Sequence, residues 1–418
     1  MMEIIPKNLT DNTVRVPGSK SYTHRVCMAA ALSNGPCRVL GSLDSDDTRL
    51  TLSALESMGI AVGREPGAIF ISGKNGRFDP CDHPIHLGNS GTSMRLLSGL
   101  AALGIGDYVL TGSDRMQERP INDLLSALQE LGVSAVSVNN TGCPPVCITG
   151  GTITGTRTHI NCSTSSQYLS ALLLIAPCSP GGMDIEVTGG PVSKPYIDMT
   201  LDIMDRFGIT FARNGYTGFH VPGAQTYQSG EYIVEPDASQ AGYFWAAAAV
   251  TGSRVKVLGI TKASRQGDVR FAEVLAAMGC KVEYHEDGIT VIGGPLSAVT
   301  VDMADMPDLV PTLAVIAAFA DGATVIENVA HLRAKESDRL EAVKNELCKM
   351  GIDARTRDSG ISVTGGPMHG ARIKTYDDHR IAMCFSVAGL KVPGVMIENE
   401  GCVAKSFPGF FNVINALT

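Results

Sequence analysis

Small polar residues and a cation stand together ahead of an apolar run at residues 96–103. The segment 87–95 reads Leu-Gly-Asn-Ser-Gly-Thr-Ser-Met-Arg, so two glycines, hydroxyls and an amide precede Arg95. A helix starting here would offer unpaired backbone N–H groups and the positive end of its dipole. The arginine adds a full charge, which suits a phosphate or a carboxylate. An ordinary N-cap followed by a solvated arginine would account for the same pattern.

Other polar clusters with cations also precede helix-like runs in the first half. Lys20 and Arg25 lie at the start of an Ala-rich run, and Arg119 precedes Pro120, which suits a first helical position. Two further clusters, Ser165-Ser166-Gln167 and Ser193-Lys194-Pro195-Tyr196, are dense in hydroxyl groups. This density suits a phosphorylated or polyhydroxylated ligand, whereas simple N-capping would use only one of the serines.

Carboxylates and cations alternate in the second half. Asp308 follows Pro307 at the head of an apolar run, where it can cap a helix or serve as a base. The segment 331–339 places Glu336 between Lys335 and Arg339, a spacing that is also typical of a salt-bridged surface helix. Asp377-Asp378-His379-Arg380 and, later, Lys405 complete the charged motifs.

A repeat of about seventy residues organises the chain, which is too long a period for a solenoid. Five predicted helices end in a glycine before a strand, at Gly59, Gly132, Gly208, Gly279 and Gly351. Six other runs are apolar nearly all round, which predicts buried helices with polar N-termini. We therefore expect an α/β protein of six βαβαββ repeats, the sixth of them truncated after residues 395–398.

The repeats should form two domains. Residues 232–237 follow the same pattern as residues 14–20: a strand, a proline, a polar cap and a helix. Three repeats lie between these segments and three follow them. We expect one domain at residues 18–234 and another at residues 1–17 plus 235–418, joined by two chain crossings in a clamshell.

Composition limits the classes of function. The 418 residues are 44% hydrophobic and carry a net charge of −8, which argues against a general nucleic-acid surface. Apolar runs are too short for a membrane span, and no signal-peptide pattern is visible. The eleven cysteines are expected to be reduced thiols. Possible metal ligands near Cys81 and Cys143 lack a second ligand pair, so we predict no metal site. A cytoplasmic monomer is expected.

Taken together, the motifs resemble those of the 5-enolpyruvylshikimate-3-phosphate synthase family. The matching segments span nearly the whole chain, at residues 17–21, 87–95, 115–120, 165–168, 192–196, 235–239, 335–339, 378–380 and 404–408. The resemblance implies two domains of three βαβαββ repeats each, an inverted α/β barrel. It also implies a reaction without metal or cofactor, in which phosphoenolpyruvate donates its enolpyruvyl group to the 5-hydroxyl of shikimate 3-phosphate.

The resemblance also implies a role for each matching residue. Shikimate 3-phosphate would be held by Lys20, Ser21, Arg25, Ser165, Ser166, Gln167, Ser193, Tyr196, Asp308, His331 and Lys335. Phosphoenolpyruvate would be held by Lys20, Asn89, Gly91, Thr92, Arg119, Gln167, Arg339, Arg380 and Lys405. The catalytic residues would be Lys20, Asp308, Glu336 and His379. Asp308 would act at the 5-hydroxyl and Glu336 at the pyruvyl methylene.

Two residues depart from the family pattern. His331 stands where many members carry Asn, and Leu96 stands where the best-known members carry Pro. The second difference predicts weakened inhibition by glyphosate, because position 96 belongs to the helix behind Gly91.

Two alternative functions remain. A sister enolpyruvyl transferase acting on UDP-N-acetylglucosamine would carry a Lys-Asn pair and an Arg-Pro-Cys loop, where this chain has Lys20-Ser21 and Arg119-Pro120-Ile121. A non-catalytic anion-binding scaffold would need the helix starts but not Asp308 and Glu336.

Overall fold

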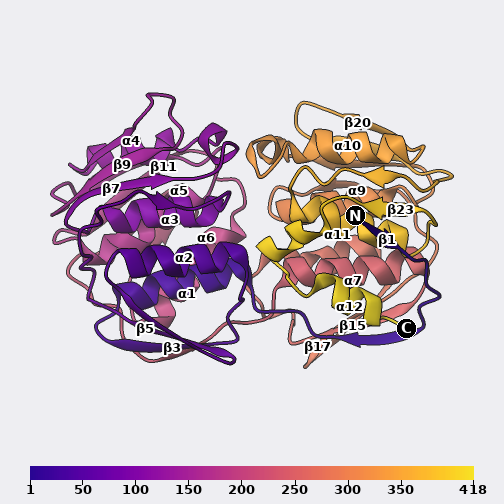
Figure 1. Cartoon of the computed structure of the whole chain (residues 1–418), viewed down its shortest axis with the longest axis horizontal. Helices are drawn as coiled ribbons and strands as arrows, with labels where there is room; N and C mark the ends of the chain where they lie inside the picture. The colour runs from indigo at the N-terminus through magenta and orange to yellow at the C-terminus, as the bar shows by residue number, and fades with distance from the viewer. The chain divides into compact units, whose positions relative to one another are not determined.

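The protein is described from a computed structural model that covers every residue, Met1–Thr418. The chain divides into two compact domains (Figure 1). The N-terminal domain is Gly18–Val234, and the C-terminal domain combines Met1–Pro17 with Glu235–Thr418. The chain thus starts in the C-terminal domain with β1 (Met2–Ile4) and β2 (Asp11–Val14), leaves it, and returns at residue 235.

The N-terminal domain contains three sheets with one common pattern. In each, the first pair of strands in spatial order is parallel and the next two pairs are antiparallel. The sheets are β14 (Glu231–Ile233), β3 (Pro36–Leu40), β5 (Ala68–Ser72), β4 (Ala61–Glu65); β6 (Ile85–His86), β7 (Gly106–Thr111), β9 (Val146–Gly150), β8 (Ser134–Ser137); and β10 (Arg157–Asn161), β11 (Met183–Gly189), β13 (Gly218–Val221), β12 (Ala212–Asn214). The first sheet therefore takes its edge strand from the end of the domain.

The C-terminal domain repeats this pattern twice and then varies it. Its two four-stranded sheets are β2, β15 (Arg254–Leu258), β17 (Gly288–Ile292), β16 (Lys281–His285); and β18 (Thr300–Asp302), β19 (Ala323–Glu327), β21 (Ile361–Thr364), β20 (Asp353–Thr356). The third sheet is β22 (Arg372–Ile373), β23 (Val395–Ile397) and β1. There β1 pairs antiparallel with β23, so the start of the chain takes the place of a missing hairpin strand.

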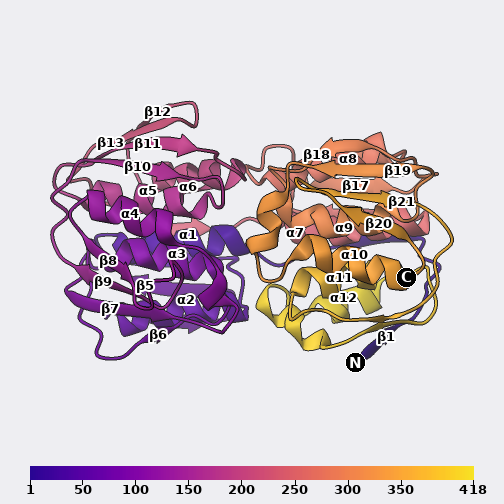
Figure 2. The same ribbon diagram turned by 90° about the horizontal axis from the view of Figure 1, so that it is seen from above.

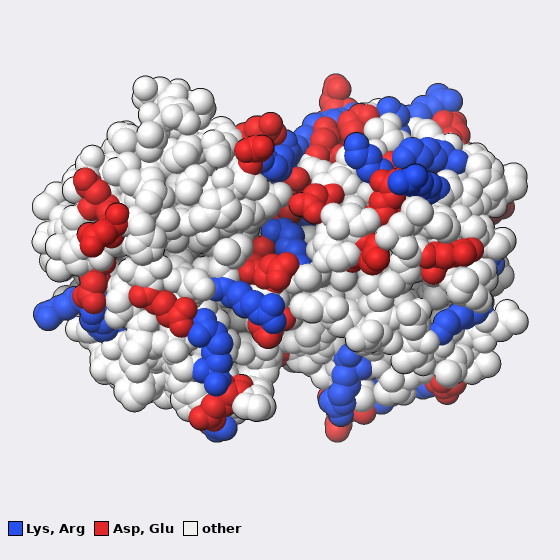
Figure 3. Space-filling model, viewed as in Figure 1, with Lys and Arg blue, Asp and Glu red and all other residues white.

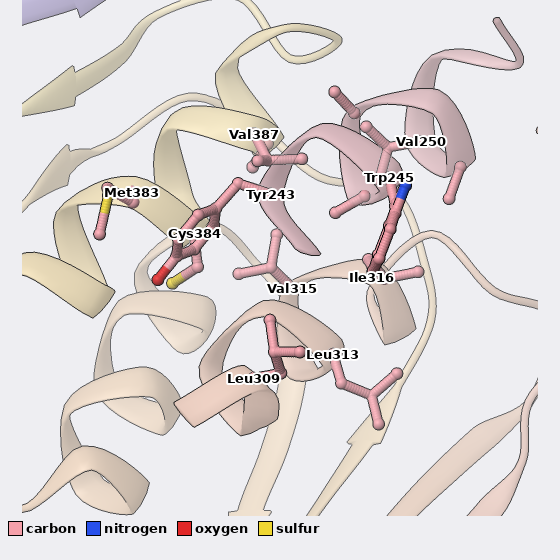
Figure 4. Packing of buried hydrophobic residues seen from close by; sticks show 14 of the residues in the cluster. Tyr243, Trp245, Val250, Leu309, Leu313, Val315, Ile316, Met383, Cys384 and Val387 are labelled. Carbon is pink, nitrogen blue, oxygen red and sulfur yellow. The ribbon is translucent and has the colours of Figure 1, made fainter. Parts of the chain in front are cut away.

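Six buried helices lie inside the two domains, as the apolar runs predicted. They are α1 (Lys20–Leu32), α3 (Gly91–Ala101), α5 (Gln167–Ile175), α7 (Ala238–Thr251), α9 (Val310–Ala317) and α11 (His379–Gly389). In both ribbon views the strands lie largely outside these helices within each domain (Figure 2). Figure 4 shows aromatic and aliphatic side chains filling the space between α7, α9 and α11, with Tyr243 beside Cys384.

A second set of helices ends at the predicted glycines. These helices are α2 (Asp46–Ser57), α4 (Asn122–Glu130), α6 (Pro195–Arg206), α8 (Phe271–Ala277) and α10 (Arg339–Lys349). The glycine after each has positive φ, from 80° at Gly208 to 111° at Gly279, so it turns the chain where other residues would be strained.

The sixth repeat is more complete than the sequence predicted. After β23 the chain continues through the 3₁₀ turn η6 (Glu400–Lys405) and a further helix, α12 (Phe410–Ala416). Phe407, Phe410 and Phe411 of this segment are buried, and the rings of Phe407 and Phe410 contact Phe244 of α7. The sixth repeat therefore lacks only the two-stranded hairpin that follows the second helix in the other repeats.

Charged residues of both signs are interspersed on the face shown in Figure 3. Many charged residues pair at the surface, for example Arg49 with Asp44 and Arg64 with Glu56. None of the helices is both long enough and apolar enough to cross a membrane.

Candidate active site

The start of α1 places a lysine in the interior of the N-terminal domain. Ser19 caps the helix by accepting a hydrogen bond from the Tyr22 N–H, and Lys20 is the first helical residue. The Lys20 ammonium is buried and lies 3.3 Å from the carboxylate of Asp47 in α2. A buried charge needs such a partner, so Asp47 fixes the position of this ammonium.

Arg25, further along α1, is a buried cation held by neutral groups. Its guanidinium donates to Thr200 Oγ1 at 2.7 Å, to Ser170 Oγ at 3.3 Å, and to the carbonyls of Ser21 and Tyr196 at 3.0 and 3.1 Å. No carboxylate is among these acceptors. Burial lowers the pKa of Arg25 to about 10, although the phenol of Tyr196 opposes the shift. An anion bound here would stabilise the charged guanidinium.

The start of α3 gathers two further arginines around a glycine. Arg119 is buried and donates to both the backbone carbonyl and the Oδ1 of Asn89, each at 3.0 Å. Arg95 donates to the Gly91 carbonyl at 3.2 Å and to the Pro120 carbonyl at 2.9 Å. A Cβ at Gly91 would lie 2.4 Å from Arg119 Nη2 and 2.5 Å from Arg95 Nη1. Glycine therefore lets both guanidiniums approach this helix start.

Pro120 does not begin the next helix, contrary to its predicted place at the first helical position. Helix α4 has Ile121 as its N-cap and starts at Asn122. The Pro120 carbonyl accepts hydrogen bonds from Arg95 and, at 2.6 Å, from the Tyr168 hydroxyl. These bonds anchor the proline ahead of the helix.

The third repeat adds hydroxyl and amide groups. The Gln167 amide donates to Thr92 Oγ1 at 3.0 Å and so links α5 to α3, while Ser165 Oγ accepts the Gln167 N–H. Ser193 has φ of +56°, and its buried hydroxyl has no hydrogen-bond partner. Positive φ is costly for serine and an unpaired buried hydroxyl is costly as well, so both observations point to a ligand at this position.

In the C-terminal domain, Asp308 bridges two buried arginines. It lies in the 3₁₀ turn η4 (Pro307–Leu309), and the N-cap of α9 is Leu309, so Asp308 does not cap the helix as the isolated pattern favoured. Its Oδ1 accepts from Arg339 Nη1 at 2.9 Å and its Oδ2 from Arg380 Nη2 at 2.7 Å. The carboxylate is thus held between the two guanidiniums.

Arg339 is the first residue of α10 and is buried, so a surface salt-bridged helix is the wrong interpretation of this segment. Besides Asp308 it binds Glu336 Oε2 at 3.0 Å and Asp378 Oδ2 at 2.8 Å. Burial alone would lower the pKa of Arg339, but the three carboxylates outweigh it and raise the pKa above its usual value. Lys335 lies outside the helix, directly after η5 (Ala330–Ala334).

Arg380 completes this cluster from the start of α11. Its Nη1 donates to the Tyr243 hydroxyl at 3.2 Å, and its backbone N–H donates to Asp378, the N-cap of α11. Burial would lower the pKa of Arg380, but Asp308 acts against burial and the net shift is upward. The cap and the tyrosine therefore hold this arginine in addition to Asp308.

The two histidines that were predicted as site residues lie in the same domain. His331, in η5, is buried, and burial together with the charge of Lys335 lowers its pKa to about 3, so the ring is neutral near pH 7. His379 is fully buried at the start of α11, with its Nδ1 3.7 Å from Asp378 Oδ1. Lys405 is half-buried at the end of η6.

Each domain thus collects its own set of predicted residues. The N-terminal domain holds Lys20, Ser21, Arg25, Asn89, Gly91, Thr92, Arg119, Ser165, Ser166, Gln167, Ser193 and Tyr196. The C-terminal domain holds Asp308, His331, Lys335, Glu336, Arg339, His379, Arg380 and Lys405. No group of three or more His, Cys, Asp or Glu side chains has an arrangement suited to a metal ion.

Asp268 was not among the residues predicted from the sequence. It lies in η3 (Gly267–Arg270), is buried, and accepts a hydrogen bond from Ser239 Oγ, while its Oδ1 has no partner. Burial raises the pKa of Asp268 to about 7, the charge of Asp308 adds to this shift, and Arg380 opposes it. A single Asp after Gln-Gly gives no sequence signal for such an environment.

A family model and curated relatives of this chain carry the name of one activity. Residues 5–414 match the family described as EPSP synthase (3-phosphoshikimate 1-carboxyvinyltransferase). A 3-phosphoshikimate 1-carboxyvinyltransferase from Syntrophobacter fumaroxidans is 44% identical over 405 residues, 96% of each chain. Another from a Sulfurovum species is 43% identical over 420 residues, 99% of this chain and 98% of its own.

Solved structures confirm the predicted fold class. An EPSP synthase from Acinetobacter baumannii, 30% identical, matches 99% of this chain and 97% of its own with a TM-score of 0.82. The enolpyruvyl transferase NikO from Streptomyces tendae, at 19% identity and a TM-score of 0.77, covers 99% of this chain and 96% of its own and shares the fold. With a family match over nearly its full length and relatives above 40% identity, the chain belongs to the EPSP synthase family, the 3-phosphoshikimate 1-carboxyvinyltransferases.

Proposed function

We propose that this chain transfers the enolpyruvyl group of phosphoenolpyruvate to the 5-hydroxyl of shikimate 3-phosphate and releases phosphate, a step of aromatic amino-acid biosynthesis. The observation that carries the proposal is the cluster of Asp308 and Glu336 with two buried guanidiniums, Arg339 and Arg380. It combines carboxylates that can move protons with cations that can bind an anionic substrate.

The proposed reaction is an addition followed by an elimination. The 5-hydroxyl oxygen attacks C2 of phosphoenolpyruvate and loses its proton, while C3 gains one, which gives a tetrahedral ketal phosphate. The bond between C2 and the phosphate oxygen then breaks, and the new methyl group loses a proton to restore the double bond. Asp308 is proposed to accept the hydroxyl proton, and Glu336 to exchange the proton at C3.

The arginines and lysines are proposed to neutralise the anionic groups of the two substrates. Arg339 and Arg380 suit the carboxylate of phosphoenolpyruvate, since a planar guanidinium can bind a carboxylate through two parallel hydrogen bonds. Lys20 and Arg119 would hold its phosphate beside the open helix start at Gly91. Lys335 and Lys405 would add charge from the C-terminal domain.

The hydroxyl-rich part of the N-terminal domain is proposed to hold shikimate 3-phosphate. Arg25 supports this role because its buried charge has only neutral acceptors. Ser193 supports it because its hydroxyl is unpaired and its backbone is strained. Resemblance to the family motifs supports the same role for Ser165, Ser166, Gln167 and Tyr196.

We also propose that the enzyme works in the cytoplasm as a monomer and without a cofactor. All eleven cysteines are free thiols, which suits a reducing compartment. Sedimentation of the purified protein tests the monomer, and activity after dialysis against a chelator tests independence from a metal.

Release of phosphate from phosphoenolpyruvate tests the proposed reaction. We expect release when shikimate 3-phosphate is present and none when it is omitted or replaced by UDP-N-acetylglucosamine. Release with the nucleotide sugar alone would establish the sister transferase. Absence of release with either acceptor, from a protein that still binds both substrates, would establish a non-catalytic binding protein.

A further inference from the structure

Asp308 accepts the hydrogen bonds from two arginines that a bound carboxylate would need. One of its oxygens accepts from Arg339 at 2.9 Å and the other from Arg380 at 2.7 Å. A small carboxylate held between these two guanidiniums would make the same pair of charge-assisted hydrogen bonds. Phosphoenolpyruvate, the proposed substrate, carries such a carboxylate. The protein's own side chain therefore competes with the substrate for these donors.

Asp308 is the most exposed of the three carboxylates that bind Arg339. Its side chain is 20% exposed, compared with 10% for Glu336 and 0% for Asp378. Asp378 is also fixed as the N-cap of α11 and by a hydrogen bond from Ser337. Asp308 lies in a short 3₁₀ turn and has no such cap to maintain. It is thus the carboxylate that a ligand can displace most readily.

Both arginines keep other partners when Asp308 leaves. Arg339 retains two hydrogen bonds to Asp378, from its Nε at 2.8 Å and its Nη2 at 3.3 Å. Arg380 retains the hydroxyl of Tyr243 at 3.2 Å. The two guanidiniums would therefore stay oriented, and the donors released by Asp308 would be ready for another carboxylate.

From this arrangement we infer that Asp308 is an internal stand-in for the substrate carboxylate, which holds the arginine pair until a hydroxyl of the sugar phosphate draws it away. This inference rests on the proposed function. A carboxylate stabilised by two guanidiniums is a weak proton acceptor, because opposite charges favour its ionised form. When Asp308 leaves the two arginines, their donors become available to the carboxylate of phosphoenolpyruvate. The same movement makes Asp308 a better base for the hydroxyl.

Binding of phosphoenolpyruvate in the absence of sugar phosphate tests this exchange. We expect Asp308→Ala to bind phosphoenolpyruvate about tenfold more tightly than the wild type by isothermal titration calorimetry, within the ~5–150-fold usual for coupled sites. Asp308→Asn keeps the shape and one acceptor oxygen, so its gain should be smaller. Shikimate 3-phosphate should strengthen phosphoenolpyruvate binding in the wild type and have little effect on it in Asp308→Ala.

Glu336→Gln is the matched control, because it removes one negative charge from Arg339 and leaves the Asp308 bridge in place. An equal gain in the control would mean that charge alone raises the affinity, and the stand-in would be refuted. Unchanged or weaker binding in both Asp308 variants would also refute it. Failure of the proposed function has a separate signature, namely a wild-type protein that releases no phosphate although Asp308→Ala binds phosphoenolpyruvate more tightly.

Discussion

Asp308 and Glu336 both accept hydrogen bonds from the guanidinium of Arg339, but they are proposed to move different protons. We expect Asp308→Asn and Glu336→Gln each to lower turnover by about 10²–10⁴-fold, because an amide cannot accept or return a proton. Phosphate release under saturating substrates measures this change. Glu341→Gln is the control, because it removes a carboxylate that pairs with Lys344 within α10, the helix that Arg339 begins, and it should retain wild-type turnover. Near-normal rates in both active-site variants would contradict the proposed proton transfers.

Gly91 tests how closely the arginines must approach the start of α3. A methyl group there would lie 2.4 Å from Arg119 and 2.5 Å from Arg95, so the guanidiniums must shift. We expect Gly91→Ala to raise KM for phosphoenolpyruvate by roughly tenfold or more, since misplacement by about 1 Å can cost up to ~10²-fold. Gly63→Ala is a matched control, because its methyl would meet only Phe70, with the Cβ nearest at 3.5 Å. An unchanged KM in Gly91→Ala would show that the arginines relocate without loss.

The raised pKa of Asp268 leads us to expect that this residue's contribution to folding stability depends on pH. Its pKa is about 7 in the folded protein, compared with 3.8 as the ordinary value. Between these two pH values the unfolded chain releases the proton and the folded protein keeps it, so the contribution of Asp268 to stability falls as pH rises and levels off above pH 7. Asparagine does not titrate. The stability of Asp268→Asn relative to wild type should therefore increase by a few kcal/mol from about pH 4 to pH 8, at ~1.4 kcal/mol per pKa unit.

Thermal unfolding of both proteins across this pH range measures the difference. The exposed residue Asp358 provides the control, since Asp358→Asn should track the wild type at every pH. A constant offset between Asp268→Asn and the wild type would show that the buried carboxyl does not titrate in this range.

The sequence indicated which residues are candidates for the site, but it did not indicate which of them contact one another. The cations and hydroxyls stand at helix starts, which is a local feature that motif spacing reveals. The bridge between Asp308, Arg339 and Arg380 joins residues from three separate helix starts, so only the folded chain shows it. The positive φ of Ser193 and the burial of Asp268 are likewise consequences of packing that no local pattern encodes.

At the scale of elements, the alternation of buried and glycine-ended helices followed directly from the sequence. Apolar residues all round a helix and a glycine at its end are local signals, and both were confirmed in the structure. The last repeat was predicted less well. Helix α12 is short and follows a Pro-Gly pair, and β1 replaces a hairpin strand from the opposite end of the chain. Neither relation lies within a local sequence window.

Leu96 lies within the regular helix α3, at the position where the family resemblance led us to expect proline. It is fully buried and lies inside Gly91–Ala101, where a proline would remove a backbone donor and cost about 3 kcal/mol. We expect weak glyphosate inhibition in the wild type and stronger inhibition in Leu96→Pro, because the altered helix moves Gly91 and Thr92. Inhibition constants against phosphoenolpyruvate measure both. Wild-type inhibition at low micromolar concentration, with no change in the variant, would contradict this expectation.

The whole molecule has one continuous domain inserted into a discontinuous one. The Asp237 N–H donates to the Pro17 carbonyl at 2.9 Å, so the two ends of the discontinuous domain lie side by side. We expect a chain that joins Pro17 to Glu235 through a short flexible linker to fold and to unfold cooperatively by circular dichroism. Residues 235–418 alone are the control and should be much less stable, because they lack β1 and β2. Equal stability of the two would show that the first strands contribute little.

The pairing of β1 with β23 also constrains how the protein is made. Met2 leaves the ribosome well before its partner Ile397, which follows roughly 400 residues later, and at ~5–20 residues per second this is a wait of some tens of seconds. The inserted domain has all of its strands long before then and can mature while the leading segment remains without its neighbours. Until Val395–Ile397 emerges, Ile4 of the nascent chain has no sheet to cover it. A chain terminated shortly before residue 395 would therefore have all the strands of the inserted domain but would lack the strand that pairs with β1.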